Sequence, residues 1–96
     1  MHACFTYTYI YIVTLGVEGV VIISADGVPI RTTLDKEKTI QFAALFSHLS
    51  SKARSLIKKI NGNDNLEVLR LRSFKHEIIV TPETDYILIV VQNPKV

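Results

Sequence analysis

The chain has 96 residues, of which 48% are hydrophobic and 21% are charged, and its formal net charge is +2. This length supports one domain with one hydrophobic core, near the lower limit for independent stability, and such small domains often complete their core against a partner. The weak net charge and the lack of a lysine–arginine run interleaved with aromatic residues argue against nucleic-acid binding.

The first 15 residues are predicted to form a segment that precedes a domain at residues 16–96. Its uncharged stretch CFTYTYIYIVTL, residues 4–15, is too short to span a bilayer and lacks the basic start of a signal peptide. Its alternating threonine and tyrosine residues favour an extended strand. Cys4 is the only cysteine of the chain, which excludes an internal disulfide bond and is typical of a cytoplasmic protein.

Two antiparallel strands joined by a tight turn are predicted next. The sequences VEGVVIIS, residues 17–24, and VPIRTT, residues 28–33, are rich in β-branched residues. The pair Asp26-Gly27 between them tolerates the backbone conformation that a hairpin turn requires. Pro29 has no N–H to donate to a neighbouring strand, so the second strand is expected at an edge of the sheet.

One long helix is predicted from residue 36 to residue 60. Asp35 is a suitable N-cap, lysines occupy the last turn, and Asn61-Gly62 provides a stop. At about 100° per residue, eight apolar side chains form a stripe roughly 120° wide, which we expect to cover the sheet. The stripe consists of Phe42, Leu45, Phe46, Leu49, Ala53, Leu56, Ile57 and Ile60.

A second stripe on one flank of the helix consists of Ala43, Ser47, Ser50 and Arg54. Small side chains allow another backbone to approach closely, so this flank is suited to receive a second helix. The alternative is that these serines are ordinary solvent-exposed residues.

A third strand, LEVLRLRS at residues 66–73, is predicted after the helix. Its alternation places Leu69 and Leu71 on one face and Arg70 and Arg72 on the other. Such a pattern is typical of a strand with one face buried and the other exposed.

Two further strands complete the expected fold. HEIIVT at residues 76–81 and YILIVVQ at residues 86–92 are separated by the turn PETD, and the last strand is apolar on both faces, as in a central strand. The predicted order is therefore β-β-α-β-β-β, an α/β domain with a five-stranded, mostly antiparallel sheet and one long helix.

The sequence carries no recognisable catalytic, cofactor-binding or metal-binding motif. The glycines lack the spacing of a phosphate-binding loop, and His2, His48 and His76 have no partner at metal-ligand spacing. The serines near His48 lack an acid to orient the histidine as a base. Glu77 is most simply a cross-strand charge partner. We therefore expect a protein that is not an enzyme and needs no cofactor.

Several spaced motifs together resemble the Roadblock family of dynein light chains. These are GVEGVVIISADGVPIRTT, the KAR at residues 52–54, LRLRSFKHEIIVTP and DYILIVVQNP, and the match runs from about residue 16 to residue 94. The most specific parts are GVPIRTT and YILIVVQNP. The resemblance implies a Roadblock-type, profilin-like fold.

The resemblance also implies a function. It implies a non-catalytic accessory light chain that binds the intermediate chain of a dynein motor and helps to link cargo to microtubules in the cytoplasm, without membrane insertion. The alternative is a scaffold of the same fold that regulates a small GTPase, since Roadblock domains also resemble components of such complexes.

The family architecture implies a homodimer in which the long helices pack together and the third strands join edge to edge. Together with the two patterns described above, it predicts a dimer interface formed by Ala43, Ser47, Ser50, Arg54, Leu69 and Leu71. A basic region near the dimer seam is predicted to orient an acidic or amphipathic partner segment, and it consists of Arg54, Arg70, Arg72 and Lys75.

The N-terminal segment, residues 1–15, departs from the family pattern. Family members usually carry a charged amphipathic helix before the first strand, and here an uncharged stretch stands in its place. The architecture implies a helix that covers the second face of the last strand, whereas the composition favours a strand. We expect residues from Tyr9 to Leu15 to lie against the sheet, with the helix preferred, and residues from Met1 to Thr8 to be loosely held.

Overall fold

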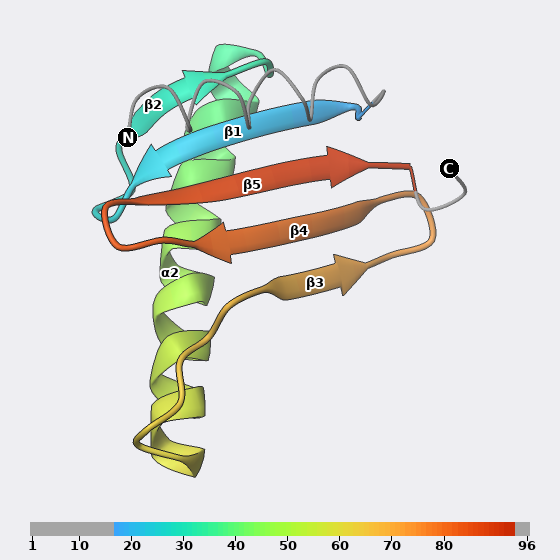
Figure 1. The fold of residues 1–96 in the computed structure, drawn as a ribbon. Helices are drawn as coiled ribbons and strands as arrows, with labels where there is room; N and C mark the ends of the chain where they lie inside the picture. Colours follow the sequence, from blue (N-terminus) through green and yellow to red (C-terminus); the bar gives the residue numbers. More distant parts are fainter. Residues whose placement is uncertain (1–16, 94–96) are drawn as a thin grey trace.

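The computed structural model describes residues 17–93. The predictions made for residues 1–15 lie outside the described residues. The described chain contains five strands and one helix in the predicted order (Figure 1). They are β1 (Gly19–Ser24), β2 (Pro29–Thr32), α2 (Lys36–Ile60), β3 (Leu69–Arg72), β4 (Glu77–Pro82) and β5 (Tyr86–Gln92).

The five strands form one sheet in the order β2-β1-β5-β4-β3, and each described pair of neighbours is antiparallel. The prediction that the last strand is central is confirmed, because β5 lies between β1 and β4. Ile87 and Ile89 of β5 belong to the core beneath α2, while Val90 is buried on the opposite face. The prediction that Pro29 marks an edge strand is also confirmed, since β2 is the first strand of the sheet.

Strand β3 is shorter than the predicted strand at residues 66–73. Leu69 pairs with Val80, so continuing the same register would place residue 67 opposite Pro82. Because proline cannot donate a hydrogen bond to a neighbouring strand, the ladder has no donor there. Residues 66–68 accordingly form a loop.

The turn between β1 and β2 is built as its sequence predicts. The backbone N–H of Gly27 donates to the carbonyl of Ser24 at 2.9 Å, and the N–H of Ser24 donates to the carbonyl of Val28 at 2.8 Å. Gly27 has φ of 91°, a left-handed conformation that residues with a side chain rarely adopt. The turn therefore requires glycine at this position.

Helix α2 begins and ends where its capping residues predict. The carboxylate of Asp35 accepts a hydrogen bond from the N–H of Lys38 at 2.8 Å, which satisfies one of the free donors of the first turn. At the other end, the N–H of Asn61 donates to the carbonyl of Ile57 at 3.0 Å, and Asn61 is extended. The stop is therefore made by an extended asparagine and not by a left-handed Gly62.

The prediction that the whole apolar stripe of α2 covers the sheet is wrong. The buried residues of the helix are Thr39, Ala43, Phe46 and Ser50, whereas Leu45, Leu56 and Ile60 are 57%, 59% and 74% exposed. The helix is turned so that small side chains face the sheet, because these permit the close approach of helix and strands. As a result, much of the apolar stripe lies on an exposed flank.

Helix α2 also extends beyond the sheet. Figure 1 shows that it runs across the strands from the side of β2 and continues past β3. None of residues 51–60 is buried, and only Ala53 and Ile57 are half-buried. We call residues 51–60 the overhang.

Although α2 has 25 residues, it is too polar to qualify as a membrane-crossing helix, and the described part of the chain offers no other candidate.

Candidate partner-binding surfaces

The first candidate surface is the free edge of the sheet at β3. This strand is hydrogen-bonded to β4 on one side, and no other strand of the described part of the chain pairs with its other side. The predicted alternation is confirmed, because Leu69 packs against the core beneath α2 and Arg70 points to the opposite face, which we call the outer face. Leu71, which shares the helix-facing side with Leu69, is 38% exposed. An edge with free backbone groups is a ready template for pairing with another strand.

The second candidate surface is the exposed apolar flank of α2, which consists of Leu45, Leu49, Leu56 and Ile60. At 100° per residue these positions fall within about 60° of one another. Phe42 and Lys38 begin the same flank, and they line a hollow together with Ile78 of β4. Ile78 pairs with Leu71 of β3, so the flank and the free edge lie on the same side of the molecule.

We call this combined surface the seam surface; it comprises Leu45, Leu49, Leu56, Ile60 and Leu71. Sequence reasoning assigned the four helical residues to the core and so missed them as surface residues. A signal was present, since seven large side chains over about 120° exceed what one sheet face of a short domain needs.

Two residues of the predicted dimer interface are already buried within the protomer. Ala43 and Ser50 are 2% and 1% exposed, and they face the sheet. Ser47 is half-buried, and its hydroxyl donates to the carbonyl of Ala44 at 3.2 Å. A second copy therefore has the apolar flank available to it, instead of the stripe of small residues. The dimer itself stays a prediction.

The remaining residues of that predicted interface are divided between the core and the surface. Leu69 is half-buried and Leu71 is accessible at the sheet edge. Arg54 is exposed and lines an open hollow of about 700 Å³ between α2, the loop before β3 and the turn after β4. Glu67 and Glu83 share this hollow with Arg54 and Lys58, so its mixed charges do not select a ligand of one sign.

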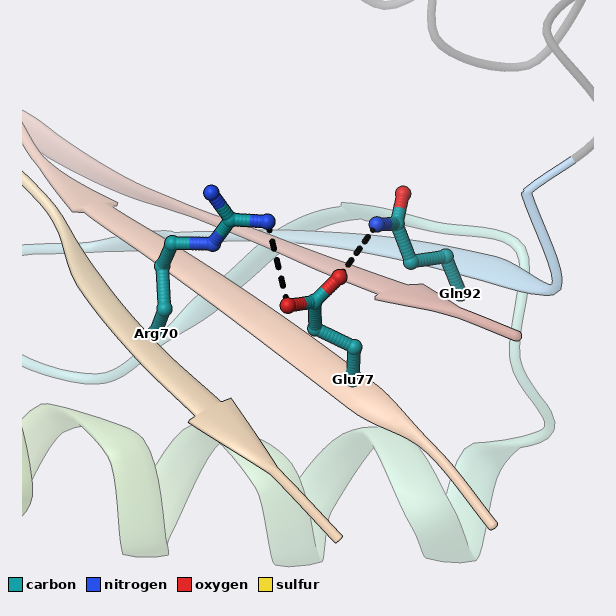
Figure 2. Close-up of polar contacts among 3 residues, drawn as sticks. All are labelled: Arg70, Glu77 and Gln92. Carbon is teal, nitrogen blue, oxygen red and sulfur yellow. Dashed lines mark hydrogen bonds and ion pairs between the residues drawn. The ribbon is translucent and has the colours of Figure 1, made fainter. Parts of the chain in front are cut away.

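A polar cluster links three strands on the outer face of the sheet (Figure 2). Arg70 of β3 forms an ion pair with Glu77 of β4, with 3.0 Å between Nη2 and Oε2. The side-chain amide of Gln92, on β5, donates to Oε1 of Glu77 at 2.7 Å. Both carboxylate oxygens are thus engaged, and the prediction that Glu77 is a cross-strand charge partner is confirmed. The contribution of Gln92 was missed because it lies 15 residues away in the sequence.

The environment of Glu77 favours its charged form. The hydrogen bond from Gln92 lowers the pKa of the Glu77 carboxyl most, and the positive charges of Arg70 and Arg72 lower it further. Partial loss of hydration acts in the opposite direction but does not prevail, so the pKa lies below its ordinary value. Glu77 is 8% exposed, and its hydrogen bonds compensate for this burial.

The predicted basic region is split by the sheet. Arg70 and Arg72 lie on the outer face, whereas Arg54 belongs to the helix on the other face. Lys75 is an exposed residue of the turn between β3 and β4. Within one protomer, the structure therefore brings together the two arginines of β3 but not Arg54.

Comparison with known protein families identifies the fold. A family model described as the Roadblock/LC7 domain matches residues 13–93, most of the chain. The chain belongs to the Roadblock/LC7 domain family. The match covers each described strand and α2, including the free edge of β3 and the overhang.

Three solved structures with the Roadblock/LC7 fold are similar to this chain. The Roadblock/LC7 domain from Streptomyces avermitilis has a TM-score of 0.75 and 22% identity, covering 80% of this chain and 66% of that chain. MglB of Myxococcus xanthus has a TM-score of 0.70 and 16% identity, covering 82% and 66%. The gliding protein mglB of Thermus thermophilus has a TM-score of 0.70 and 13% identity, covering 83% and 63%. This chain thus spans just under two thirds of those chains, and identities this low show the fold alone.

Proposed function

We propose that this Roadblock/LC7 protein is a non-catalytic scaffold that works as a dimer and binds a small GTPase. The observation that carries the dimer is the combination of a free β3 edge with a helix that extends past that edge. A sheet that ends at β3 leaves the overhang, ten of the 25 residues of α2, without strands to cover. A second copy that continues the sheet at β3 would supply strands beneath the overhang.

The dimensions of the overhang match this arrangement. Ten helical residues, 51–60, span about 15 Å, since each residue rises about 1.5 Å. Neighbouring strands lie about 4.8 Å apart, so the overhang has the width of about three strands. A second copy joined at β3 would place its own outermost strands in this position.

The apolar residues of the seam surface supply the driving force. Leu56 and Ile60 are 59% and 74% exposed, and Leu45 is 57% exposed. Fully burying such a side chain is worth about 1.5–3 kcal/mol relative to leaving it in water. In a symmetric dimer both copies use the same patch, so each of these residues is buried in both copies.

Two considerations support a small GTPase as the partner. Roadblock domains resemble components of complexes that regulate small GTPases, and none of the three similar solved structures described above carries dynein in its name. The second candidate is a dynein light chain that binds the intermediate chain in the cytoplasm. It is favoured by the segments LRLRSFKHEIIVTP and DYILIVVQNP, which resemble that family.

An affinity experiment distinguishes the two candidates. Tagged full-length protein is used to capture partners from a cell extract supplied with GDP or with a non-hydrolysable GTP analogue, and bound proteins are identified by mass spectrometry. Recovery of a small GTPase in a nucleotide-dependent manner, without dynein chains, is the result expected. Recovery of dynein intermediate and heavy chains would instead establish the second candidate.

A matched pair of variants shows whether the captured partner requires the dimer. Leu56→Asp introduces a charge into the seam surface, whereas Ile30→Asp introduces one at an exposed residue of β2, at the opposite edge of the sheet. The partner should be lost with the first variant and retained with the second.

A further inference from the structure

The charges on the outer face of β3 are not balanced. This strand contributes two guanidinium groups to that face, from Arg70 and Arg72. The neighbouring strand β4 contributes one carboxylate, from Glu77. Glu77 is in contact with Arg70 and lies directly opposite Arg72 in the strand register. One carboxylate thus lies beside two guanidinium groups, so these three side chains together carry a net charge of +1 in each protomer.

Dimer formation through β3 would double this excess at one place. A two-fold axis that pairs β3 with its copy in an antiparallel arrangement keeps both α2 helices on the same face of the sheet. Both copies of Arg70 and of Arg72 then lie on the common outer face, whatever the register of the two strands. Four guanidinium groups and two carboxylates would meet on strands about 4.8 Å apart. Like charges at such positions repel each other across a strand pair.

We propose that the outer face of this seam binds a carboxylate-rich segment of a protein partner. The inference rests on the proposed dimer, since one protomer provides only half of the site. It deepens the proposed function by naming the chemistry that a partner must present. A carboxylate is one of the groups that the guanidinium fork binds with two parallel hydrogen bonds.

The arginines are held in place for such a ligand. Arg70 is fixed by its ion pair with Glu77, and Glu77 is in turn held by Gln92 (Figure 2). The Arg70 side chain nevertheless remains 61% exposed, so a partner can reach it. A cation that is already oriented loses less conformational entropy on binding than a freely rotating one.

The neighbouring turn adds an apolar contact. Phe74 is 86% exposed and follows β3 directly, next to Lys75. Phe74 can therefore receive an apolar residue that stands beside the carboxylates of a partner segment. A nucleic acid is disfavoured because the site is small and the whole chain has a net charge of only +2.

The test measures binding of fluorescently labelled hexaglutamate to the full-length protein at low salt, with the mass of the protein determined in parallel. Hexaglutamine and a single-stranded thymidine hexanucleotide are the control ligands. We expect one hexaglutamate to bind per dimer, no binding of hexaglutamine, and weaker binding of the oligonucleotide. Binding should weaken as salt is added, because exposed charges are screened.

Variants of matched chemistry locate the site. Arg72→Gln should reduce hexaglutamate affinity at least about fivefold, and the double variant with Arg70→Gln at least about tenfold, as for loss of charged contacts at an interface rim. Arg31→Gln is the control, since Arg31 belongs to β2 at the opposite edge of the same sheet. Thermal melting of each variant confirms that it is folded.

A second measurement uses the repulsion within the dimer. Arg72→Gln should lower the dissociation constant of the dimer at low salt, because it removes two of the four like charges.

A dimer that binds hexaglutamate equally well with and without Arg72 would overturn the proposal while leaving the dimer intact. Equal affinity for the oligonucleotide would also overturn it. A monomeric wild-type protein would overturn both this inference and the proposed function, and the measured mass identifies that case.

Discussion

At the scale of single residues, the turn between β1 and β2 depends on Gly27. Its φ of 91° is strained for other residues, and a Cβ added there would lie 3.0 Å from the hydroxyl oxygen of Ser47. Gly27→Ala should therefore lower the free energy of unfolding by about 1–2 kcal/mol, measured by urea denaturation at fixed protein concentration. Gly62→Ala is the control, because a Cβ there meets no atom within 4 Å. Equal losses in the two variants would contradict this account of the turn.

Ser50 is a buried residue whose hydroxyl contributes nothing visible to stability. It is 1% exposed, and its oxygen has no hydrogen-bond partner among residues 17–93. Ser50→Ala removes this unsatisfied group and improves helix propensity, so the free energy of unfolding should rise by about 0.5–1 kcal/mol. The matched change Thr39→Val should lower it by about 1 kcal/mol, since the Thr39 hydroxyl lies 2.8 Å from that of Thr32. A clear loss of stability in Ser50→Ala would show that its hydroxyl has a partner.

Glu77 makes the stability of the fold depend on pH in the acid range. Its pKa in the folded protein lies below the ordinary glutamate value of 4.5, chiefly because Gln92 donates a hydrogen bond to it. A lowered pKa contributes stability that is fully present above that ordinary value and is lost as the pH falls through the folded-state pKa. Denaturation measured over a series of acid pH values should show this loss in the wild type and a smaller loss in Glu77→Gln. Glu67→Gln, in the exposed loop before β3, is the control for removing one carboxylate outside this cluster.

At the scale of elements, the two sides of α2 make different contributions. The residues that face the sheet hold the protomer together, whereas the seam surface is available for a second copy. Leu56→Asp should raise the dissociation constant of the dimer more than about 100-fold, because a buried charge costs on the order of 3 kcal/mol. Leu71→Asp should act in the same way. Sedimentation at a series of concentrations gives these constants, and a dimer unaffected by either variant would place the interface elsewhere.

The bounds of α2 could be predicted from the sequence, but its rotation could not. Asp35 and the terminal lysines act on neighbouring backbone groups, so their effect is visible locally. Which face of α2 packs on the sheet depends instead on how closely the helix and the sheet fit together. Here the face that packs on the sheet carries Ala43 and Ser50 in place of larger residues. The sequence also indicated an alternating strand with two outward arginines. It did not indicate that the amide of Gln92 completes their cluster, because that contact likewise depends on how whole elements pack together.

At the scale of the whole molecule, the sequence predicted the element order and the central position of β5, because a strand that is apolar on both faces must be covered on both. It also placed β2 at an edge through Pro29. The overhang could not be predicted, since it depends on where α2 crosses the strands (Figure 1). The two edges of the sheet therefore differ. At β2, a proline limits pairing with a further strand, whereas at β3 the edge is available for pairing and α2 projects past it.

The most direct test of this account is the mass of the full-length protein in solution. Light scattering coupled to size-exclusion chromatography, at micromolar concentration and moderate salt, measures it without assumptions about shape. The account predicts twice the mass of the 10.8 kDa chain, with conversion to the single-chain mass in Leu56→Asp. A wild-type protein with the mass of one chain would contradict it, because the free β3 edge and the overhang would then have no second copy to complete them.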